Sequence, residues 1–369
     1  MKNNFLNISF LFVLISILAF FSVSYAFIPQ TNFSEHENRL LQTFPTFTFE
    51  KLLDGSYTHQ LHNYFSDQIN LRTAMIKTKS IIELTMGKKE NNGILLGKDD
   101  YLIEAPSYSE ANYKYLKNNL AKIENLMNKL KKNNIKIISA IIPRKIDVSE
   151  DKLPKLYSTE RNKNIWQYVN NNHINLTHAL SNKENVFYKT DHHWTSNGAF
   201  SAYVSLANKL GFSPLPLDFF KIKVLSNEFL GTTYSKSGFF FTNPEKIETP
   251  TIENGKYKMT IVDTNTEFTT LYDVSYLNKK DKYSTFLSGN NAHVKIYDIQ
   301  NANKETLLII KDSFSHSLAP YLCEHYNLEL IDPRYYNGSI EKYVVENNIQ
   351  NLLFLFGLDT LALADLVIR

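Results

Sequence analysis

Short, almost wholly apolar runs alternate with amphipathic segments through most of this 369-residue chain. The first is the isoleucine-rich run 135–142, and similar runs follow at 306–310, 328–331 and 352–356. Strands that are buried on both faces have this continuous apolar character, and they occur in parallel sheets covered by helices. The alternation therefore predicts an α/β fold, with a mostly parallel sheet that helices flank on both faces.

A long amphipathic helix is predicted just before the first of these strands. Ser107 and Glu110 have the spacing of a capping box, in which the side chain of each residue accepts a hydrogen bond from the other's backbone N–H. The apolar residues that follow recur at helical spacing and define one face: Leu116, Leu120, Ile123, Met127 and Leu130. We expect this face to cover the sheet.

The rest of the chain suggests two further regions besides the α/β domain, which spans 96–369. Residues 28–95 carry apolar side chains at helical spacing and predict a helical lead-in. Residues 212–300 contain many short β-like runs. We interpret this second region as a β-rich insertion within the α/β domain.

The first 27 residues resemble an export or anchor segment. Lys2 precedes an apolar stretch from Phe5 to Phe27, which is long enough to span a bilayer as a helix. Residues 24–26 also fit a signal-peptidase site loosely. We favour an uncleaved signal anchor over a cleaved signal peptide. Either reading puts the rest of the chain outside the cytoplasm, at the cell membrane if the segment is kept or secreted if it is removed.

Composition and charge exclude several classes of protein. Apolar residues make up 43% of the chain, which is ample for a packed core. The formal net charge is only +3 and there is no arginine-rich arm, so nucleic acid is not an expected partner. The single cysteine, Cys323, excludes an intrachain disulfide.

Two short motifs carry groups that could perform chemistry together. The string Thr-Asp-His-His-Trp-Thr occupies 190–195, and Lys-Asp-Ser-Phe-Ser occupies 311–315, directly after an apolar strand. A serine hydroxyl needs a base within hydrogen-bond reach, and that base needs a partner that fixes its tautomer. We therefore predict Ser313 as nucleophile, His193 as general base and then acid, and Asp191 as the residue that orients His193. Backbone N–H groups at the following helix start could stabilise an oxyanion.

Each motif also has a plainer interpretation. Asp191, His192 and His193 could bind zinc, but no further ligand stands at matching spacing, so we expect neither a metal nor another cofactor. Trp194 could contact a substrate or could simply belong to the core. An Asp-Ser pair after a strand is common, and only the two motifs together make a specific signal.

The string at 190–195 resembles the signature of the DHHW proteins, which belong with the alginate-type O-acetyltransferases in the SGNH hydrolase superfamily. Other segments follow the order of that family and extend the resemblance over about 35–369: Gly97–Leu102, Pro143–Lys145, Leu153-Pro154, Gly231-Thr232, Ser288–Asn290, Lys311–Ser313 and Asp332–Tyr335. The resemblance implies an SGNH-hydrolase-like parallel sheet with a permuted site, in which the Asp-x-His motif precedes the serine. The middle residue of that motif varies in the family, so His192 is not the expected base.

The resemblance also implies an activity and its partners. Family members usually move acetyl groups onto extracellular or cell-wall polysaccharides. A membrane-bound O-acyltransferase is thought to supply the acetyl group across the membrane. Ser313 would carry it as an acyl-enzyme until a hydroxyl of the polysaccharide acceptor displaces it.

The chain departs from the family pattern in two places. Asp100 replaces a turn glycine, which is tolerable because Asp adopts turn conformations. No Gly-x-Asn-Asp block follows near 356–357, so we take Gly289 and Asn290 as the oxyanion donor pair. Arg334 is expected either to bind a substrate carboxylate or carbonyl, or to form a structural salt bridge.

Four functions remain open at the level of sequence. The first is a polysaccharide O-acetyltransferase, and the second is a carbohydrate acetylesterase that uses the same three residues. The third is a polysaccharide assembly protein without catalysis, and the fourth is a metal-dependent hydrolase. The triad alone cannot separate transfer from hydrolysis, because the difference lies in how well the acyl-enzyme excludes water.

Overall fold

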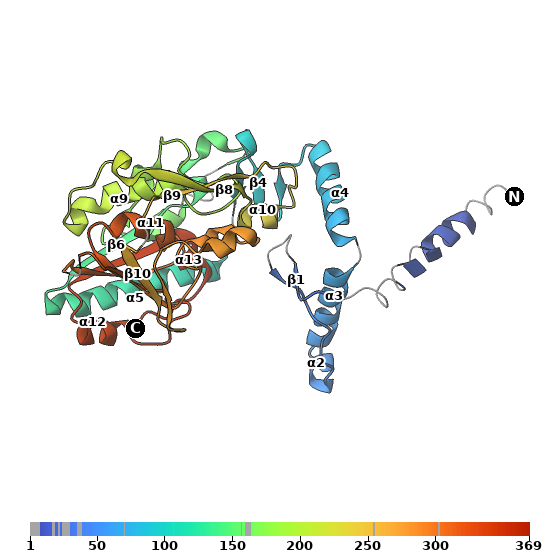
Figure 1. The fold of residues 1–369 in the computed structure, drawn as a ribbon. Coiled ribbons are helices and arrows are strands. Elements are labelled where there is room, and N and C mark those ends of the chain that lie inside the picture. The colour runs from blue at the N-terminus through green and yellow to red at the C-terminus, as the bar shows by residue number, and fades with distance from the viewer. Residues whose placement is uncertain are drawn as a thin grey trace. The chain divides into compact units, whose positions relative to one another are not determined.

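The computed structural model describes residues 8–16, 19–20, 23, 30–34, 39–69, 71–105, 107–155, 157–158, 164–253, 255–301 and 303–369 (Figure 1). The chain divides into two compact units. One comprises Met1–Lys88 with Gly238–Phe240, and the other comprises Lys89–Ser237 with Phe241–Arg369.

The first unit contains the N-terminal segment. Most of the predicted anchor or signal segment, 1–27, lies outside the described residues. Among the residues that are described, no helix is long and apolar enough to cross a membrane. Residues 8–16 of this unit are helical. Its further regular elements include the antiparallel pair β1 (Phe33–Ser34) and β2 (Arg39–Leu40) and the helices α2 (Phe49–Leu53), α3 (Ser56–Gln68) and α4 (Arg72–Thr85).

The second unit is built around an eight-stranded sheet. The strand order is β11-β10-β12-β14-β13-β15-β6-β7. The bounds of these strands, in chain order, are β6 (Lys136–Ile142), β7 (Ile174–Asn175), β10 (Tyr257–Ile261), β11 (Thr266–Phe268), β12 (His293–Asp298), β13 (Thr306–Lys311), β14 (Asn327–Ile331) and β15 (Asn351–Gly357). The smaller sheets are β3 (Glu90–Asn91), β4 (Ile94–Leu96) and β5 (Leu102–Glu104), and the hairpin β8 (Ile222–Phe229) with β9 (Glu245–Pro250).

Five neighbouring strands of the large sheet, from β14 to β7, run parallel. β12, β10 and β11 add to the β14 edge in antiparallel fashion. These three strands come from 257–298, inside the region that the sequence predicts to be a β-rich insertion. The sheet is therefore mixed, and the predicted α/β fold with flanking helices is confirmed.

Both faces of the sheet are buried, and the side chains of each strand alternate between two cores. Leu307 and Ile309 of β13 enter the core under α9 (Ser196–Leu210) and α11 (Ser315–Leu322), whereas Leu308 and Ile310 enter the opposite core. That opposite core also contains apolar residues of α5 (Glu110–Leu130), α12 (Ile340–Glu346) and α13 (Leu358–Leu363). The short helix α8 (Thr177–Leu180) joins the first core, whereas α6 (Lys145–Val148) and α10 (Thr232–Ser237) pack against the small sheet of β3, β4 and β5.

The long helix α5 has the predicted buried face but a different cap. All five predicted face residues are buried in the core beneath the sheet. The helix begins at Glu110, and Ser109 caps it in a reciprocal box with Asn112. The predicted box of Ser107 with Glu110 is therefore wrong. Glu110 is the first helical residue and not the third, so its side chain does not stand at the capping position.

Leu353 on β15 offers a test of this packing, because its side chain is fully buried in the core under α9 and α11. We expect Leu353→Ala to lower the free energy of unfolding by about 2–5 kcal/mol, through lost burial and the cavity left behind. Urea unfolding followed by circular dichroism measures this change. Val345→Ala on the exposed side of α12 is the control, with an expected effect within about 0.5 kcal/mol. Equal effects of the two changes would contradict the two-core arrangement.

Candidate active site

Four strands of the sheet end at one edge, and the residues that follow them meet there. Pro143 follows β6, Asp312 follows β13, Asp332 follows β14, and Leu358 follows β15. Because these strands run parallel, their carboxyl ends share one edge of the sheet. In open α/β sheets the crevice outside the carboxyl ends is the usual place for a ligand.

The Asp-His-His-Trp string forms a tight turn that faces this edge. Phe187 and Trp194 pair as an isolated antiparallel bridge, and the Tyr188 N–H donates to the His193 carbonyl at 3.1 Å. Thr195 then caps α9 by accepting from the Gly198 N–H. A turn closed between a bridge and a helix start holds the residues at its tip in one conformation.

The structure brings the three predicted catalytic residues into one hydrogen-bonded chain. The Nδ1 of His193 lies 2.5 Å from Asp191 Oδ1, and its Nε2 lies 2.7 Å from Ser313 Oγ. Asp191 and His193 are buried, whereas Ser313 is partly exposed. Since the Nδ1 proton is donated to the carboxylate, Nε2 is left as an acceptor for the serine hydroxyl. This geometry is that of a nucleophile, a base and an orienting acid.

The Asp191 carboxylate is buried but well supplied with donors. Its Oδ1 also accepts from the His193 N–H, and its Oδ2 accepts from the N–H and hydroxyl of Thr232 at 2.7 and 2.9 Å. Burial raises the pKa of this carboxyl, but the neighbouring imidazoles and hydrogen bonds outweigh it and hold the pKa well below its usual range. A Cβ on Gly231 would lie 2.3 Å from Asp191 Oδ2. Only glycine therefore fits before Thr232.

Aromatic rings fix the plane of the His193 imidazole. The Tyr283 ring is stacked on it, with centroids 3.8 Å apart and planes within 8°. Phe314 packs edge-on, with centroids 5.1 Å apart. The Tyr283 hydroxyl lies 3.1 Å from Ser317 Oγ on α11, which ties the stacking ring to the helix behind the nucleophile. The His193 imidazole is thus held by packing as well as by hydrogen bonds.

Ser313 lies on the strand–turn–helix corner between β13 and α11, as predicted. The neighbouring Asp312 is fully buried, and its carboxylate holds the corner together. Its Oδ1 accepts from the Phe314 N–H at 3.0 Å, and its Oδ2 accepts from the Gly357 N–H at 2.7 Å and the Thr360 hydroxyl at 2.6 Å. Asp312 therefore links the corner that carries Ser313 to the start of α13.

The backbone N–H groups at this corner are mostly occupied. Phe314 donates to the Asp312 side chain, Ser315 to the Asp312 carbonyl, and His316 to the Ser313 carbonyl. Within the described part of the chain, the Ser313 N–H has no such acceptor. It is the group at the corner that remains available to an oxyanion.

His192 differs from His193 in role and in charge. Burial lowers the pKa of its imidazole to about 4, so the ring is neutral near pH 7. Its Nδ1 lies 2.8 Å from the Thr232 hydroxyl, whose proton is donated to Asp191. His192 must therefore be the donor in this contact, and it supports Thr232 without contacting Ser313.

Asp191, His192 and His193 also form the group of described residues that could hold a metal ion. Their ligand atoms lie within 4.8 Å of one another. However, both oxygens of Asp191 and both ring nitrogens of His193 already have hydrogen-bond partners. The side chains of Asp191 and His193 therefore fit a hydrogen-bonded chain that ends at Ser313 better than they fit a metal centre.

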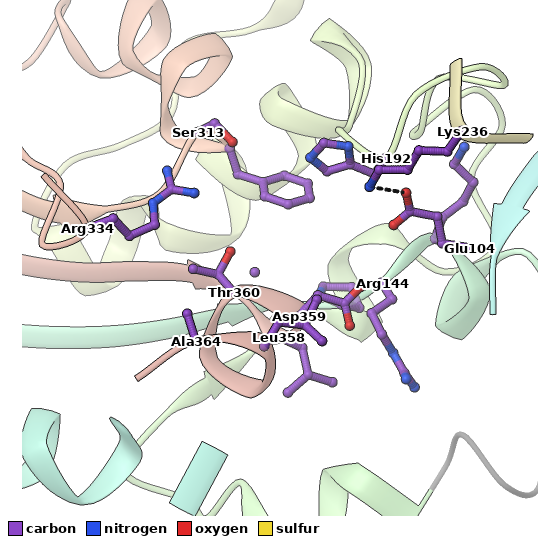
Figure 2. A pocket seen from close by; sticks show the side chains of 15 residues that line it. Glu104, Arg144, His192, Lys236, Ser313, Arg334, Leu358, Asp359, Thr360 and Ala364 are labelled. Atoms are coloured by element: carbon purple, nitrogen blue, oxygen red, sulfur yellow. Dashed lines mark hydrogen bonds and ion pairs between the residues drawn. The ribbon is translucent and has the colours of Figure 1, made fainter. Parts of the chain in front are cut away.

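A cavity of about 250 Å³ opens beside Ser313 (Figure 2). Ser313 and His192 contribute to one side, and Leu358, Asp359 and Thr360 at the start of α13 contribute to another. Phe314 also lines the cavity. The remaining lining residues are Glu104, Pro143, Arg144, Lys145, Lys236, Arg334, Gly357, Leu363 and Ala364. The cavity thus combines apolar surface with several charged side chains.

Arg334 forms the structural salt bridge that is one of its two predicted roles, and its binding of a substrate stays a prediction. Its Nη2 and Nε donate to the Asp332 carboxylate at 2.6 and 2.9 Å, which is a bidentate salt bridge. The side chain also lines the cavity and points toward Ser313 in Figure 2. Behind it, Lys311 is buried with Asp332 and His316. This network fixes the guanidinium at the cavity wall.

Three other predicted contact residues do not line the cavity. Trp194 is fully buried, and its indole N–H donates to the Phe314 carbonyl and the Ser317 hydroxyl. It therefore supports the nucleophile corner from the core. The Gly289 N–H donates to the Phe286 carbonyl, and Asn290 is exposed. Neither is among the residues beside Ser313, so the pair is not in place as an oxyanion hole.

Sequence reasoning missed several residues that build the site. In the sequence, Thr232 stands out only as part of the Gly231-Thr232 segment that resembles the family, and its position after that glycine is the one signal for it. Tyr283 and Glu245 had no local signal. Glu245 accepts from the N–H groups of Lys189 and Thr190, and so holds the turn that carries Asp191.

A family model described as "DHHW protein" matches residues 94–331. The chain belongs to this family. The match includes the turn with Asp191 and His193 and the corner with Ser313, and it ends before α13.

A similar curated protein is the probable alginate O-acetylase AlgJ of Pseudomonas fluorescens. The two sequences are 22% identical over 172 residues, which is 43% of this DHHW protein and 44% of AlgJ. The match therefore spans less than half of that relative's length.

Two solved structures are similar over most of the chain. A DHHW family protein from Eubacterium siraeum has a TM-score of 0.57 at 20% identity, covering 74% of this chain and 93% of the other. PatB1 of Bacillus cereus, solved with a sulfonyl adduct, has a TM-score of 0.58 at 22% identity, with coverages of 73% and 97%. At these identities the likeness shows the fold, which is the expected SGNH-like one.

Asp359 is a cavity residue whose carboxyl lies in a strongly perturbed environment. The Tyr108 hydroxyl donates to its Oδ1, and Arg144 donates to the Tyr108 hydroxyl at 3.1 Å. Burial raises the pKa of Asp359 to about 6, and Arg144 opposes that rise. A carboxyl whose pKa is raised in the folded protein destabilises the fold once it ionises.

This perturbation predicts a pH-dependent difference between the wild type and Asp359→Asn. Below the unfolded pKa of 3.8, Asp359 is protonated in both states and the two proteins have similar stability. As the pH rises from there to the folded pKa of about 6, only the unfolded state ionises, so the wild type loses stability. At about pH 8 we expect the free energy of unfolding of Asp359→Asn to be higher than that of the wild type by on the order of 1–3 kcal/mol. Urea unfolding at several pH values measures this difference, and a constant difference would contradict the prediction.

Proposed function

We propose that this protein is an O-acetyltransferase that moves an acetyl group through Ser313 onto a hydroxyl of a polysaccharide. The observation that carries this proposal is the hydrogen-bonded chain from Asp191 through His193 to Ser313, beside a cavity. The likeness to a probable alginate O-acetylase supports acetyl transfer as the reaction.

In the proposed first step, Ser313 Oγ attacks the acetyl carbonyl of the donor while His193 Nε2 accepts the hydroxyl proton. Asp191 stabilises the imidazolium that forms. The Ser313 N–H and the Arg334 guanidinium stabilise the oxyanion. When the tetrahedral intermediate collapses, the bond to the donor's leaving group breaks, His193 returns the proton to that group, and Ser313 is left acetylated.

The second step reverses these roles. A sugar hydroxyl attacks the acetyl carbonyl, and its proton passes to His193. The bond to Ser313 breaks, and Oγ recovers the proton from His193. Water in place of the sugar would make the protein an acetylesterase with the same residues, so transfer depends on how the cavity favours the sugar over water.

The cellular setting is part of the same proposal. The apolar N-terminal segment would hold the protein at the extracytoplasmic face of the cell membrane, or would be cleaved to release it. A membrane-bound O-acyltransferase would supply the acetyl group there. A polysaccharide assembly role without catalysis is the alternative that the active-site variants test.

The purified protein should take an acetyl group from p-nitrophenyl acetate. We expect Ser313→Ala and His193→Ala each to lower turnover by at least about 10⁴-fold, and Asp191→Asn to lower it by about 10⁴-fold because the imidazole loses its tautomer. Release of nitrophenol measures turnover, and intact-mass spectrometry detects acetyl-Ser313.

The exposed residues Ser275 and His178 provide matched controls for these variants. Ser275→Ala and His178→Ala should turn over at the wild-type rate. If acetyl-Ser313 is lost faster when an oligosaccharide acceptor is present than in water alone, the protein is a transferase. If the acetyl group is lost at the same rate with and without the acceptor, the protein is an esterase. Turnover that survives Ser313→Ala and His193→Ala would disprove the proposed mechanism.

Metal removal gives an independent test. Because hydrogen bonds already occupy the ligand atoms of Asp191 and His193, we expect dialysis against EDTA to leave turnover within about twofold of the starting rate. Elemental analysis of the same samples would show whether zinc was present to be removed. Loss of turnover that zinc restores would favour the metal-dependent hydrolase.

A further inference from the structure

The side of the cavity formed by α13 carries a carboxyl group that the proposed acyl transfer does not use. Asp359 lines the cavity, and Tyr108 binds only its Oδ1. Within the described residues, no side chain or backbone group donates to Oδ2. The carboxyl therefore faces the cavity with one oxygen ready to accept a hydrogen bond.

A relay of side chains fixes the orientation of this carboxyl. Arg144 is held by Asp147, with two hydrogen bonds of 2.6 and 2.9 Å, and it donates in turn to the Tyr108 hydroxyl. The Tyr108 proton is thereby directed to Asp359. The next residue, Thr360, is tied to Asp312 beside the nucleophile. Asp359 and Ser313 are thus positioned in one connected framework.

The basic side chains around the cavity already have acceptors. Arg144 pairs with Asp147, Lys236 pairs with Glu104 at 3.3 Å, and Arg334 pairs with Asp332 at 2.6 Å. Arg144 and Lys236 are thereby neutralised toward a ligand. Arg334 shares Asp332 with Lys311, and its guanidinium points toward Ser313, where the proposed oxyanion forms.

Lys145 is the fourth basic residue of the cavity lining. Its ammonium donates to the carbonyls of Leu102 and Lys189. Burial lowers its pKa to about 8, which reduces its charge further above that pH. The donors of Lys145 are thus engaged by backbone carbonyls, and a negatively charged sugar ring on the α13 side of the cavity would meet the Asp359 carboxylate.

We propose that this cavity is the acceptor subsite and that it takes an uncharged, polyhydroxylated sugar, with Asp359 accepting a hydrogen bond from one of the sugar hydroxyls. Carboxylate oxygens are strong acceptors for hydroxyl donors. The apolar lining, which includes Pro143, Leu358 and Leu363, suits the C–H faces of a pyranose ring. This inference rests on the proposed acetyl transfer and narrows its acceptor: a uronate polymer, with a carboxylate on every ring, is disfavoured.

The test compares neutral and acidic acceptors on acetyl-enzyme that has already formed. The purified protein is acetylated with p-nitrophenyl acetate, and loss of acetyl-Ser313 is then followed by mass spectrometry. The acceptors are tetrasaccharides of mannose, glucose and galactose, each beside the tetra-uronate of the same sugar and linkage. We expect at least one neutral tetrasaccharide to discharge the enzyme faster than water and its uronate partner to act at least tenfold more slowly.

The Asp359→Asn variant tests whether Asp359 is responsible for the faster discharge by neutral sugars. We expect the ratio of sugar discharge to water discharge to fall about tenfold or more, because a hydrogen bond to a charged acceptor is lost. Asp365→Asn, at an exposed carboxylate paired with Lys122, is the matched control and should keep the wild-type ratio. Because Asp359→Asn is expected to be no less stable than the wild type above pH 6, a fall in the ratio is not explained by unfolding.

Direct binding separates this inference from the proposed reaction. Calorimetric titration of the same tetrasaccharides needs no acetyl-enzyme. It therefore measures the affinity of the subsite even if Ser313 is never acetylated. Neutral sugars that bind the wild type more tightly than Asp359→Asn would uphold the subsite, whatever the outcome of the acylation test. Uronates that bind or discharge as well as neutral sugars, or an Asp359→Asn variant with the wild-type ratio and affinity, would overturn it.

Discussion

The buried carboxylate of Asp191 is the constraint on which the rest of the site depends. An ionised group in the interior needs donors for both oxygens, and here four hydrogen bonds from His193 and Thr232 supply them. The Gly231 backbone must approach closely enough for Thr232 to donate, which excludes a side chain at that position. The turn between Phe187 and Trp194 follows from the same need. It brings the His193 N–H and imidazole to one oxygen of the carboxylate.

The parallel part of the sheet supplies the second constraint. Segments separated by up to about 215 residues in the sequence meet because four strands end at one edge. Asp312 then converts this proximity into a fixed geometry. By accepting from the Gly357 N–H and the Thr360 hydroxyl, it couples the nucleophile corner to the wall that carries Asp359. A Cβ at Gly357 would lie 2.9 Å from the Phe314 ring, so the coupling also needs a glycine there.

Much of this architecture could be predicted from local patterns, and the failures have local causes too. The four apolar runs became strands with two buried faces, because continuous apolar sequence leaves no face for water. The N-cap of α5 lies two residues later than predicted, because Ser109 and Asn112 form the capping box in place of Ser107 and Glu110. Gly289 and Asn290 were proposed as oxyanion donors by analogy. The Gly289 N–H instead closes its own turn with Phe286.

The sequence by itself determined the strands, the buried face of α5, and a serine, a histidine and an aspartate in the order of the family. It could do so because strand burial, helical spacing and motif spacing are properties of neighbouring residues. Only the tertiary structure decided the donors of Asp191, the stacking of Tyr283 on the base, and the raised pKa of Asp359. These depend on burial and on contacts between residues far apart in the chain, as with Tyr108 and Asp359, which are 251 positions apart. The dielectric surroundings of a group arise only when such segments pack together.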